Sequence, residues 1–394
     1  MSLPPAAESA LLCGKLVLDA AWTAFLERVR MFDNQIDLQS LGWDEFFRKA
    51  FESYRRAGCV AGRIAEEHRG IYKVLTTRGE LSGTLAGKLR YESAQSVNLP
   101  AAGDWVAVQP RYEESASTIA GVLPRKSQFV RGAAGDRTEG QIVGANVDTI
   151  FLMTALNNDF NLRRVERYLV MAWESGAQPV VLLSKSDLCL DPNQKMMEVQ
   201  ALAIGAPVHA TSVYEETGLN ALRCYFRPGK TVGLVGSSGV GKSTLINYFA
   251  GRQIQRTLEI RSHDGRGRHT TTTRQLILLP GGGLVLDTPG MRELQLWEGQ
   301  DAGLVRAFSD IESLAEQCYY RDCSHSNEPD CAVRAAMADK ELDPARLRSY
   351  EKLQKELRYQ ERKQDKAAEI REKNKWKKLC RLASEKAATK RTQE

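Results

Sequence analysis

Residues 234–247 read LVGSSGVGKSTLIN, and this stretch decides the class of fold. It satisfies the pattern G-x-x-x-x-G-K-[ST] between an apolar run, TVGLVG, and a run typical of a helix, STLINYFAG. In that context glycines let several backbone N–H groups face one anion, and the helix N-terminus adds its dipole. The sequence therefore predicts a phosphate-binding loop made of Gly236, Ser237, Ser238, Gly239, Val240, Gly241, Lys242 and Ser243, with Thr244 following.

The residue types of this loop indicate its chemistry. Lys242 is expected to bridge the β- and γ-phosphates of a nucleotide, and the Ser243 hydroxyl to ligate Mg²⁺. A chance match in a Gly- and Ser-rich turn is the alternative, and the strand, loop and helix in register disfavour it.

Apolar strands alternate with helices around the loop, which predicts an α/β domain over residues 142–300. Such alternation is typical of a mostly parallel sheet covered on both faces. The expected strands lie at 147–156, 178–188, 206–213 and 230–236, with a hairpin-like pair at 274–290. Helices are expected at 161–176, 196–205 and 243–251.

A second phosphate element is LVLDTPG, residues 284–290. Asp287 ends an apolar strand, where it can hold a water on Mg²⁺, and Gly290 can offer its amide to the γ-phosphate. Between the two elements, HDGRGRHTTTTRQ (residues 263–275) fits a switch segment, in which Thr271 or Thr272 completes the Mg²⁺ shell. An ordinary Thr-rich turn is the alternative.

The base-reading residues stand before the loop. VVLLSKSDL places Ser184, Lys185 and Asp187 at the end of a buried strand. A carboxylate there accepts hydrogen bonds from the N1–H and exocyclic amine of guanine, a donor pair that adenine lacks. The Lys185 stem would lie along the base, and a backbone N–H of Ser212 or Val213 could meet the guanine O6. K-x-D alone is common by chance; its position at a strand end favours guanine.

The order of these elements differs from that of an ordinary switch GTPase, in which the phosphate loop comes first. Chain termini lie close together in such a sheet, so moving the break keeps the contacts. The sequence therefore predicts a circularly permuted GTPase domain that holds GTP, with its switch elements immediately before the C-terminal part.

Residues 58–130 show five short alternating apolar runs separated by Gly, Pro or charged residues. Five strands in this length fit an OB-fold β barrel, a common oligonucleotide-binding fold, and a small β-domain of no particular function is an equal alternative.

A compact cysteine and histidine set follows the GTPase domain, with spacing C-x4-C-x-H-x5-C. Three thiolates and one imidazole predict a closed structural Zn²⁺ site in a helical domain over residues 301–360, with free thiols as the alternative. The four ligands are Cys318, Cys323, His325 and Cys331.

Charge and composition indicate the character of the two end segments, residues 1–57 and 361–394. The 394 residues carry a net charge of +6, and residues 346–394 hold 17 Lys and Arg against 8 Asp and Glu. This stretch therefore carries +9, which leaves −3 for the rest and favours a polyanionic partner for the basic tail, 361–394. A solvated helix face is the alternative. Residues 1–57 are expected to be helical or flexible, and the absence of a signal peptide and of a membrane-spanning run predicts a cytoplasmic protein.

The chain resembles one family in five features taken together. These are the barrel, the permuted order, the motif GRHTTT, the motif DTPG followed by RE two residues later, and the metal-ligand spacing. It is the bacterial ribosome-small-subunit-dependent GTPase A family, whose members assist late maturation of the 30S subunit. The resemblance covers roughly residues 58–360. It implies binding of GTP and Mg²⁺, docking on the 30S subunit and its 16S rRNA, faster hydrolysis when docked, release with GDP, and a monomer.

Two positions depart from common patterns. Ser184 stands where the family usually has Asn, which braces the loop and the base, so the serine is expected to weaken guanine affinity while Asp187 keeps the selectivity. Met291 stands where many switch GTPases carry a water-orienting glutamine, which predicts a slow intrinsic rate. By resemblance, His269 is the candidate for ordering the attacking water, and a histidine that contacts phosphate or rRNA is the alternative.

Two other functions remain open at this point. A nucleotide kinase or ATPase could use the same phosphate loop, but it leaves Asp187 and the cysteine cluster unexplained. A non-catalytic RNA-binding protein is permitted by Ser184 and Met291, and the intact Lys242, Ser243 and Asp287 argue against it.

Overall fold

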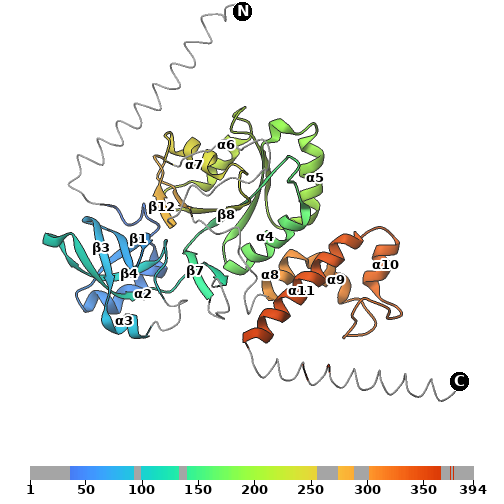
Figure 1. Ribbon diagram of the computed structural model, residues 1–394, viewed down its shortest axis with the longest axis horizontal. Coiled ribbons are helices and arrows are strands. Elements are labelled where there is room, and N and C mark those ends of the chain that lie inside the picture. Colours follow the sequence, from blue (N-terminus) through green and yellow to red (C-terminus); the bar gives the residue numbers. More distant parts are fainter. Residues whose placement is uncertain are drawn as a thin grey trace, which may run out of the picture.

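The chain folds into three parts that lie side by side (Figure 1). The computed structural model describes residues 36–92, 99–132, 140–254, 274–287 and 301–364, together with Lys373 and Trp376. A small β barrel comes first, a central sheet with helices follows, and a group of helices completes the described chain.

The barrel closes from five strands and is preceded by helix α2 (Glu45–Arg56). Strands β1, β2 and β3 form an antiparallel meander, β3 pairs in parallel with β5, and β4 returns to β1. The five strands expected from the sequence are present, and inward-facing apolar residues such as Ile64, Val106 and Ile119 fill the barrel. The bounds are β1 Val60–His68, β2 Ile71–Thr76, β3 Gly79–Leu85, α3 Gly87–Glu92, β4 Trp105–Arg111 and β5 Ala116–Val122.

The central sheet has the order β10-β9-β8-β11-β13-β12, in which only β12 runs antiparallel to its neighbour. Along β8, Ile150 and Leu152 enter one core, and Phe151 and Met153 enter the other. The parallel pairings and this burial on both sides confirm the expected sheet, which is mostly parallel and covered on both faces. The bounds are β8 Thr149–Ala155, β9 Gln178–Ser184, β10 Val208–Thr211, β11 Thr231–Gly236, β12 Arg274–Leu278 and β13 Leu284–Asp287.

Helices cover the two faces unequally. Residues of α6 (Leu219–Leu222) and α7 (Lys242–Ala250) join one core, whereas α4 (Leu162–Ser175) joins the core shared with the C-terminal helices. In Figure 1, α4 lies between the sheet and the helices α8 and α11. The remaining bounds are α5 Pro192–Leu202, α8 Asp301–Ala307, α9 Ser309–Ala315, α10 Ala332–Ala338 and α11 Pro344–Gln364.

Two features of the helices bear on the expectations. Within the expected helical domain, α8 and α9 are separated at Phe308, which leaves the helical conformation and is fully buried. None of the helices in the described part of the chain has the length and apolarity needed to cross a bilayer.

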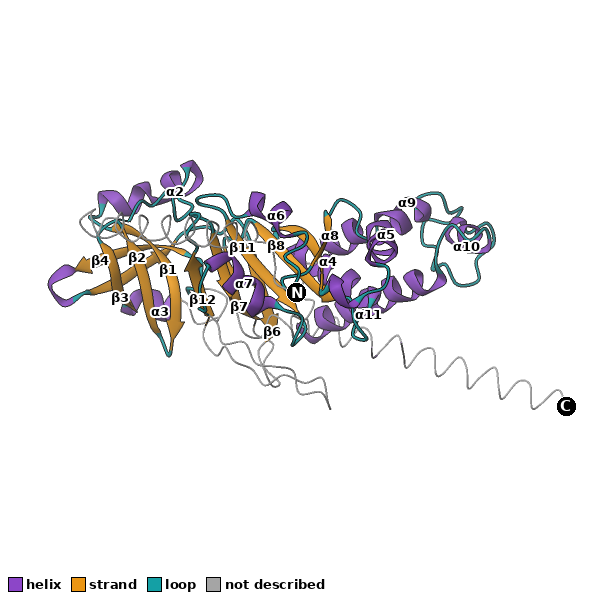
Figure 2. Ribbon diagram, turned by 90° about the horizontal axis from the view of Figure 1, so that it is seen from above, coloured by secondary structure: helices purple, strands orange, loops and turns teal. Residues whose placement is uncertain are grey.

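The barrel and the central sheet are joined by a strand pairing and by a separate hairpin. Strand β12 pairs with β1 at two positions, Glu66 with Gln275 and Glu67 with Arg274, so eleven of the described strands form one continuous sheet (Figure 2). A separate hairpin, β6 (Gln128–Gly132) with β7 (Gly140–Ala145), connects the two parts and was not foreseen from the sequence.

The buried side chain of Arg63 ties this junction together. Its guanidinium donates to the carbonyls of Leu41, Gly103 and Asn146 and, at 3.0 Å, to the Thr231 hydroxyl at the start of β11. Burial lowers the pKa of Arg63 to about 10, although Asp148 and Asp104 oppose this effect. One cation therefore connects the N-terminal segment, the barrel and the strand that leads to the phosphate loop.

Candidate functional site

The phosphate loop leaves the carboxyl end of β11 and enters α7, as its sequence predicts. Gly239 and Gly241 have φ angles of 75° and 103°, which L side chains rarely adopt, so glycine is required for this turn. The Lys242 ammonium donates to the carbonyls of Gly236 at 2.7 Å and Ser237 at 2.8 Å. The loop's own backbone thus fixes the cation at the position where phosphates are expected.

The turn that follows β9, from Ser184 to Leu188, contacts the phosphate loop directly. Ser184 ends β9 and is buried, and its hydroxyl lies 2.7 Å from the Val240 carbonyl and 3.3 Å from the Thr154 carbonyl. The single O–H therefore donates to the nearer acceptor, Val240, and this hydrogen bond braces the phosphate loop. Lys185 follows with a φ of 57°, a left-handed conformation that is uncommon outside glycine.

Asp187 lies in a short 3₁₀ turn, Ser186–Leu188, with its carboxylate held by one neighbour. The Ser212 hydroxyl donates to Asp187 Oδ1 at 2.5 Å and accepts from the backbone N–H of Glu215 at 3.1 Å. Because this serine is bonded on both sides, it fixes the rotamer of the carboxylate. Val213, partly buried, follows Ser212 beyond the end of β10.

Residues expected around Mg²⁺ lie at the same edge of the sheet. Asp287 ends β13 and is 7% exposed, and β13 runs parallel to β11 in register. Ser243 and Thr244 occupy the first turn of α7. His269, Thr271, Thr272, Gly290 and Met291 lie outside the described residues.

A polar cluster that the sequence analysis missed supports the phosphate loop. Arg164, on the first turn of α4, binds Asp159 through two hydrogen bonds of 2.5 and 2.9 Å. The Ser237 hydroxyl donates to the same carboxylate at 2.9 Å, and Arg164 reaches this hydroxyl at 3.3 Å. The hydrogen bond from Arg164 lowers the pKa of Asp159 below its ordinary value. We call these three residues the loop-support cluster.

The cysteine and histidine residues meet in one loop between α9 and α10. The ligand atoms of Cys318, Cys323, His325 and Cys331 all lie within 4.8 Å of one another. Cys318 Sγ is 3.8 Å from Cys331 Sγ and 3.7 Å from His325 Nδ1. Tetrahedral zinc–ligand bonds of about 2.0–2.3 Å place ligand atoms about 3.5–3.8 Å apart, so the donor set fits this ion.

A carboxylate outside the ligand set shapes this loop. Glu328 accepts hydrogen bonds from the hydroxyl and backbone N–H of Ser324 and from the backbone N–H of Ser326. These bonds, led by the Ser324 hydroxyl, lower the pKa of Glu328 to about 2. Glu328 therefore orders the backbone on either side of His325, as carboxylates beside metal ligands commonly do.

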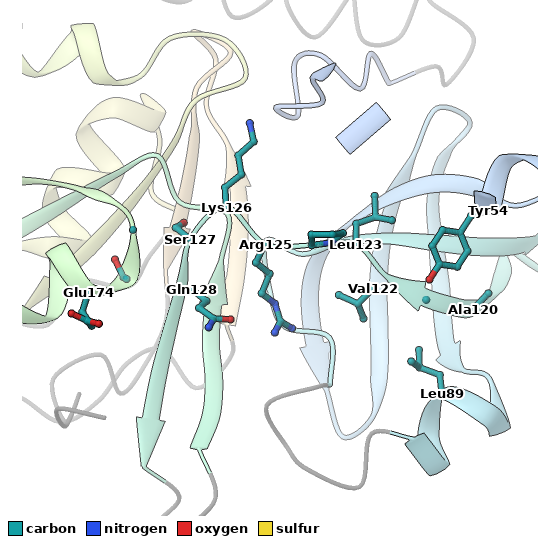
Figure 3. A pocket seen from close by; sticks show the side chains of 14 residues that line it. Tyr54, Leu89, Ala120, Val122, Leu123, Arg125, Lys126, Ser127, Gln128 and Glu174 are labelled. Atoms are coloured by element: carbon teal, nitrogen blue, oxygen red, sulfur yellow. The ribbon is translucent and has the colours of Figure 1, made fainter. Parts of the chain in front are cut away.

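A cavity of about 760 Å³ lies elsewhere, at the junction of barrel and central domain. In Figure 3, Tyr54, Leu89 and Val122 line it on the barrel side, and Gln128 and Glu174 face them. Its Arg125 is already paired, because it binds the buried Asp104 through bonds of 2.8 and 2.7 Å. The phosphate loop and the residues near Asp187 do not line this cavity.

The chain is similar to known proteins over most of its length. The family model described as RsgA GTPase matches residues 122–297. A small ribosomal subunit biogenesis GTPase RsgA from Opitutus terrae is 47% identical over 87% of this chain and 95% of its own length. A second, RsgA 2 from Lactiplantibacillus plantarum, is 49% identical over 77% of this chain and 85% of its own length.

Two solved structures are similar over 76% of this chain. YjeQ from Thermotoga maritima has a TM-score of 0.57 at 28% identity and is covered over 98% of its length. YloQ, described as a circularly permuted GTPase, has a TM-score of 0.54 at 26% identity, with 95% covered. With this identity over most of its length, and with the base-side and phosphate loops meeting in permuted order, the chain belongs to the RsgA family of GTPases.

Proposed function

We propose that this protein is a GTPase that acts in biogenesis of the small ribosomal subunit. The observation that carries the proposal is the hydrogen bond from Ser184 to Val240, which joins the predicted guanine-reading loop to the phosphate loop across 56 residues of chain. The names of the relatives, small ribosomal subunit biogenesis GTPases, support the cellular role.

On the base side, Asp187 accepts the N1–H and exocyclic amine of guanine. Ser212 holds this carboxylate, so little ordering remains to be done when the base binds. Lys185 lies along the base, and a backbone N–H of Ser212 or Val213 meets the O6 atom. Adenine presents no matching pair of donors, so Asp187 sets the choice of nucleotide.

On the phosphate side, backbone N–H groups of the loop and the N-terminus of α7 bind the phosphates, and Lys242 reaches the β- and γ-phosphates. Mg²⁺, when bound with GTP, neutralises charge between these phosphates. Ser243, Thr272 and Asp287 would hold it, directly or through water, with Thr271 as the other candidate threonine. The full proposed GTP set is Ser184, Lys185, Asp187, Ser212, Val213, Gly236, Ser237, Ser238, Gly239, Val240, Gly241, Lys242, Ser243, Thr244, Thr271, Thr272, Asp287 and Gly290.

Hydrolysis requires a water in line with the bond between the γ-phosphorus and the bridging oxygen. The water's oxygen bonds to phosphorus while that bridging bond breaks, which yields GDP and phosphate. We assign the ordering of this water to His269, and the Gly290 amide to the γ-phosphate. Met291 has no donor or acceptor suited to that task, so the rate depends on how the switch segment is held.

The remaining parts are proposed to grip ribosomal RNA. The strand order β1-β2-β3-β5-β4 and its closure support an OB-fold over residues 58–130, and the Cys3His set supports a structural Zn²⁺ in a domain over residues 301–360. The barrel, the zinc domain and the basic tail, 361–394, would contact 16S rRNA, with one copy of the chain per subunit. The cysteines in the described part of the chain are free thiols, which persist in reducing compartments, so we place this work in the cytoplasm.

The test is GTP hydrolysis measured with and without purified 30S subunits. We expect turnover to rise by orders of magnitude with the subunits, and ATP to compete poorly with GTP. Lys242→Ala is the matched control, because it removes the phosphate-binding cation and should abolish both rates. Equal rates with and without subunits would exclude the assembly role, and equal competition by ATP would exclude guanine reading.

A further inference from the structure

The loop-support cluster carries an inference that rests on the proposed GTPase function and extends it. Arg164, Asp159 and Ser237 each contact the other two, and the cluster joins α4 to the phosphate loop across more than 70 residues of chain. Ser237 is the only one of the three that belongs to the loop itself. Its hydroxyl donates to Asp159 and accepts from Arg164, so its rotamer is fixed from both sides.

The position of Ser237 explains why its rotamer matters. The Ser237 carbonyl accepts a hydrogen bond from Lys242, as does the carbonyl of Gly236 immediately before it. Glycine-rich loops have few side chains by which neighbouring elements can hold them. Ser237 supplies such a side chain in the first half of the loop, just as Ser184 holds Val240 in the second half.

The helix that presents Arg164 is itself firmly anchored. Asn161 caps its N-terminus by accepting from the backbone N–H groups of Arg163 and Arg164. Further along, the buried Glu166 binds Arg346, and Arg167 binds Glu356, both on α11. A side chain on an anchored helix positions its partner more accurately than one on a loop does.

We propose that Arg164 and Asp159 are positioning residues for nucleotide binding and hydrolysis, and that they act through Ser237 on the phosphate loop and its lysine. Neither is expected to touch the nucleotide. Their removal would let the first half of the loop shift, so that Lys242 and the loop N–H groups meet the phosphates less well.

The matched comparison is Arg164→Met with Arg163→Met. The two arginines are adjacent on α4, have side chains 30% and 33% exposed, and form ion pairs, but only Arg164 contacts the phosphate loop. We expect Arg164→Met to weaken binding of a fluorescent GDP roughly three- to tenfold, the range for a partly exposed charge-assisted hydrogen bond. Arg163→Met should leave the affinity within about twofold.

A double-mutant cycle with Ser237→Ala tests the route. If Arg164 acts through the Ser237 hydroxyl, Arg164→Met in the Ser237→Ala background should add little further loss of affinity. Additive losses of GDP affinity would mean that Arg164 does not act through the Ser237 hydroxyl. Equal GDP affinities for Arg164→Met and Arg163→Met would overturn the whole proposal. Circular dichroism shows whether Arg164→Met folds. If it does not, Ser237→Ala and Arg164→Lys replace it in the test, and both are expected to weaken GDP binding. Unchanged GDP affinity in both variants would overturn the proposal.

Kinetics separate positioning from general stability. In the absence of ribosomal subunits, Arg164→Met should raise KM and also lower kcat, because a displaced lysine serves both bound GTP and the transition state poorly. A merely structural role would lower the melting temperature and leave kcat and KM of the folded protein unchanged. Failure of the unaltered protein to bind GDP would instead refute the proposed function.

Discussion

Substitution of Arg63 by methionine tests how the barrel is fastened to the phosphate-loop strand. Methionine keeps most of the apolar stem but removes the guanidinium, which donates to four acceptors at the junction. The Gly103 carbonyl keeps a second donor, the Asn146 side-chain amide at 3.1 Å. Three acceptors, Leu41 O, Asn146 O and Thr231 Oγ1, therefore lose a charged donor.

Two opposing effects set the size of the change. A buried acceptor left unpaired costs about 1–3 kcal/mol, so three such groups cost roughly 5 kcal/mol. Against this, burial lowers the pKa of Arg63 well below its ordinary value, to about 10, which corresponds to roughly 3 kcal/mol against the charged form. Methionine would not incur this cost. We expect the unpaired acceptors to prevail, and Arg63→Met to lower the free energy of unfolding by about 2 kcal/mol.

The assay is urea unfolding followed by far-UV circular dichroism. Arg56→Met is the control, since that side chain is 77% exposed, and its midpoint should not move. Arg63→Lys should destabilise at least as much as methionine, because one ammonium cannot reach acceptors spread around a guanidinium. An Arg63→Met protein as stable as the original would refute the reasoning, since desolvation of the cation would then fully offset its hydrogen bonds.

Three further outcomes are expected. Asp187→Ala should remove the preference for GTP over ATP in competition with labelled GDP, and a preference that survives would point to another reader of the base. Ser184→Ala removes the donor to Val240 and should weaken GDP binding roughly three- to tenfold while guanine stays preferred; unchanged affinity would mean that the loop needs no such brace. Cys331→Ser should lower the zinc content measured by mass spectrometry, whereas Cys224→Ser, an exposed thiol outside the cluster, should not; full zinc content in both would exclude the Cys3His site.

Local patterns predicted much of this protein, because their physical meaning depends on near neighbours in the chain. The phosphate loop is one turn between a strand and a helix, and the Cys and His residues share one loop, so spacing alone placed them. Ser184 and Asp187 could be placed because the carboxyl ends of parallel strands meet at one edge of a sheet.

Contacts between distant side chains could not be predicted in this way. Nothing in NNDFNLRR, residues 157–164, indicates that Arg164 and Asp159 would meet a serine of the phosphate loop. The serine at position 184 suggested weaker guanine binding, and the sequence could not show that its hydroxyl would donate to the Val240 carbonyl. Such contacts depend on how elements pack in three dimensions, which periodicity does not encode.

The pairing of β1 with β12 has different consequences for the barrel and for the central sheet if the two are produced as separate proteins. A barrel freed from the rest would lose the same two residue pairs along β1, but at Glu66 and Glu67, whose carboxylates disfavour pairing with other strands and where β2 still pairs on the other side. The central sheet would lose the outer partner of β12 at Arg274 and Gln275, where open backbone N–H and C=O groups invite strands of other molecules. The isolated barrel should therefore stay dispersed in solution, while the isolated nucleotide domain should self-associate through that uncovered strand.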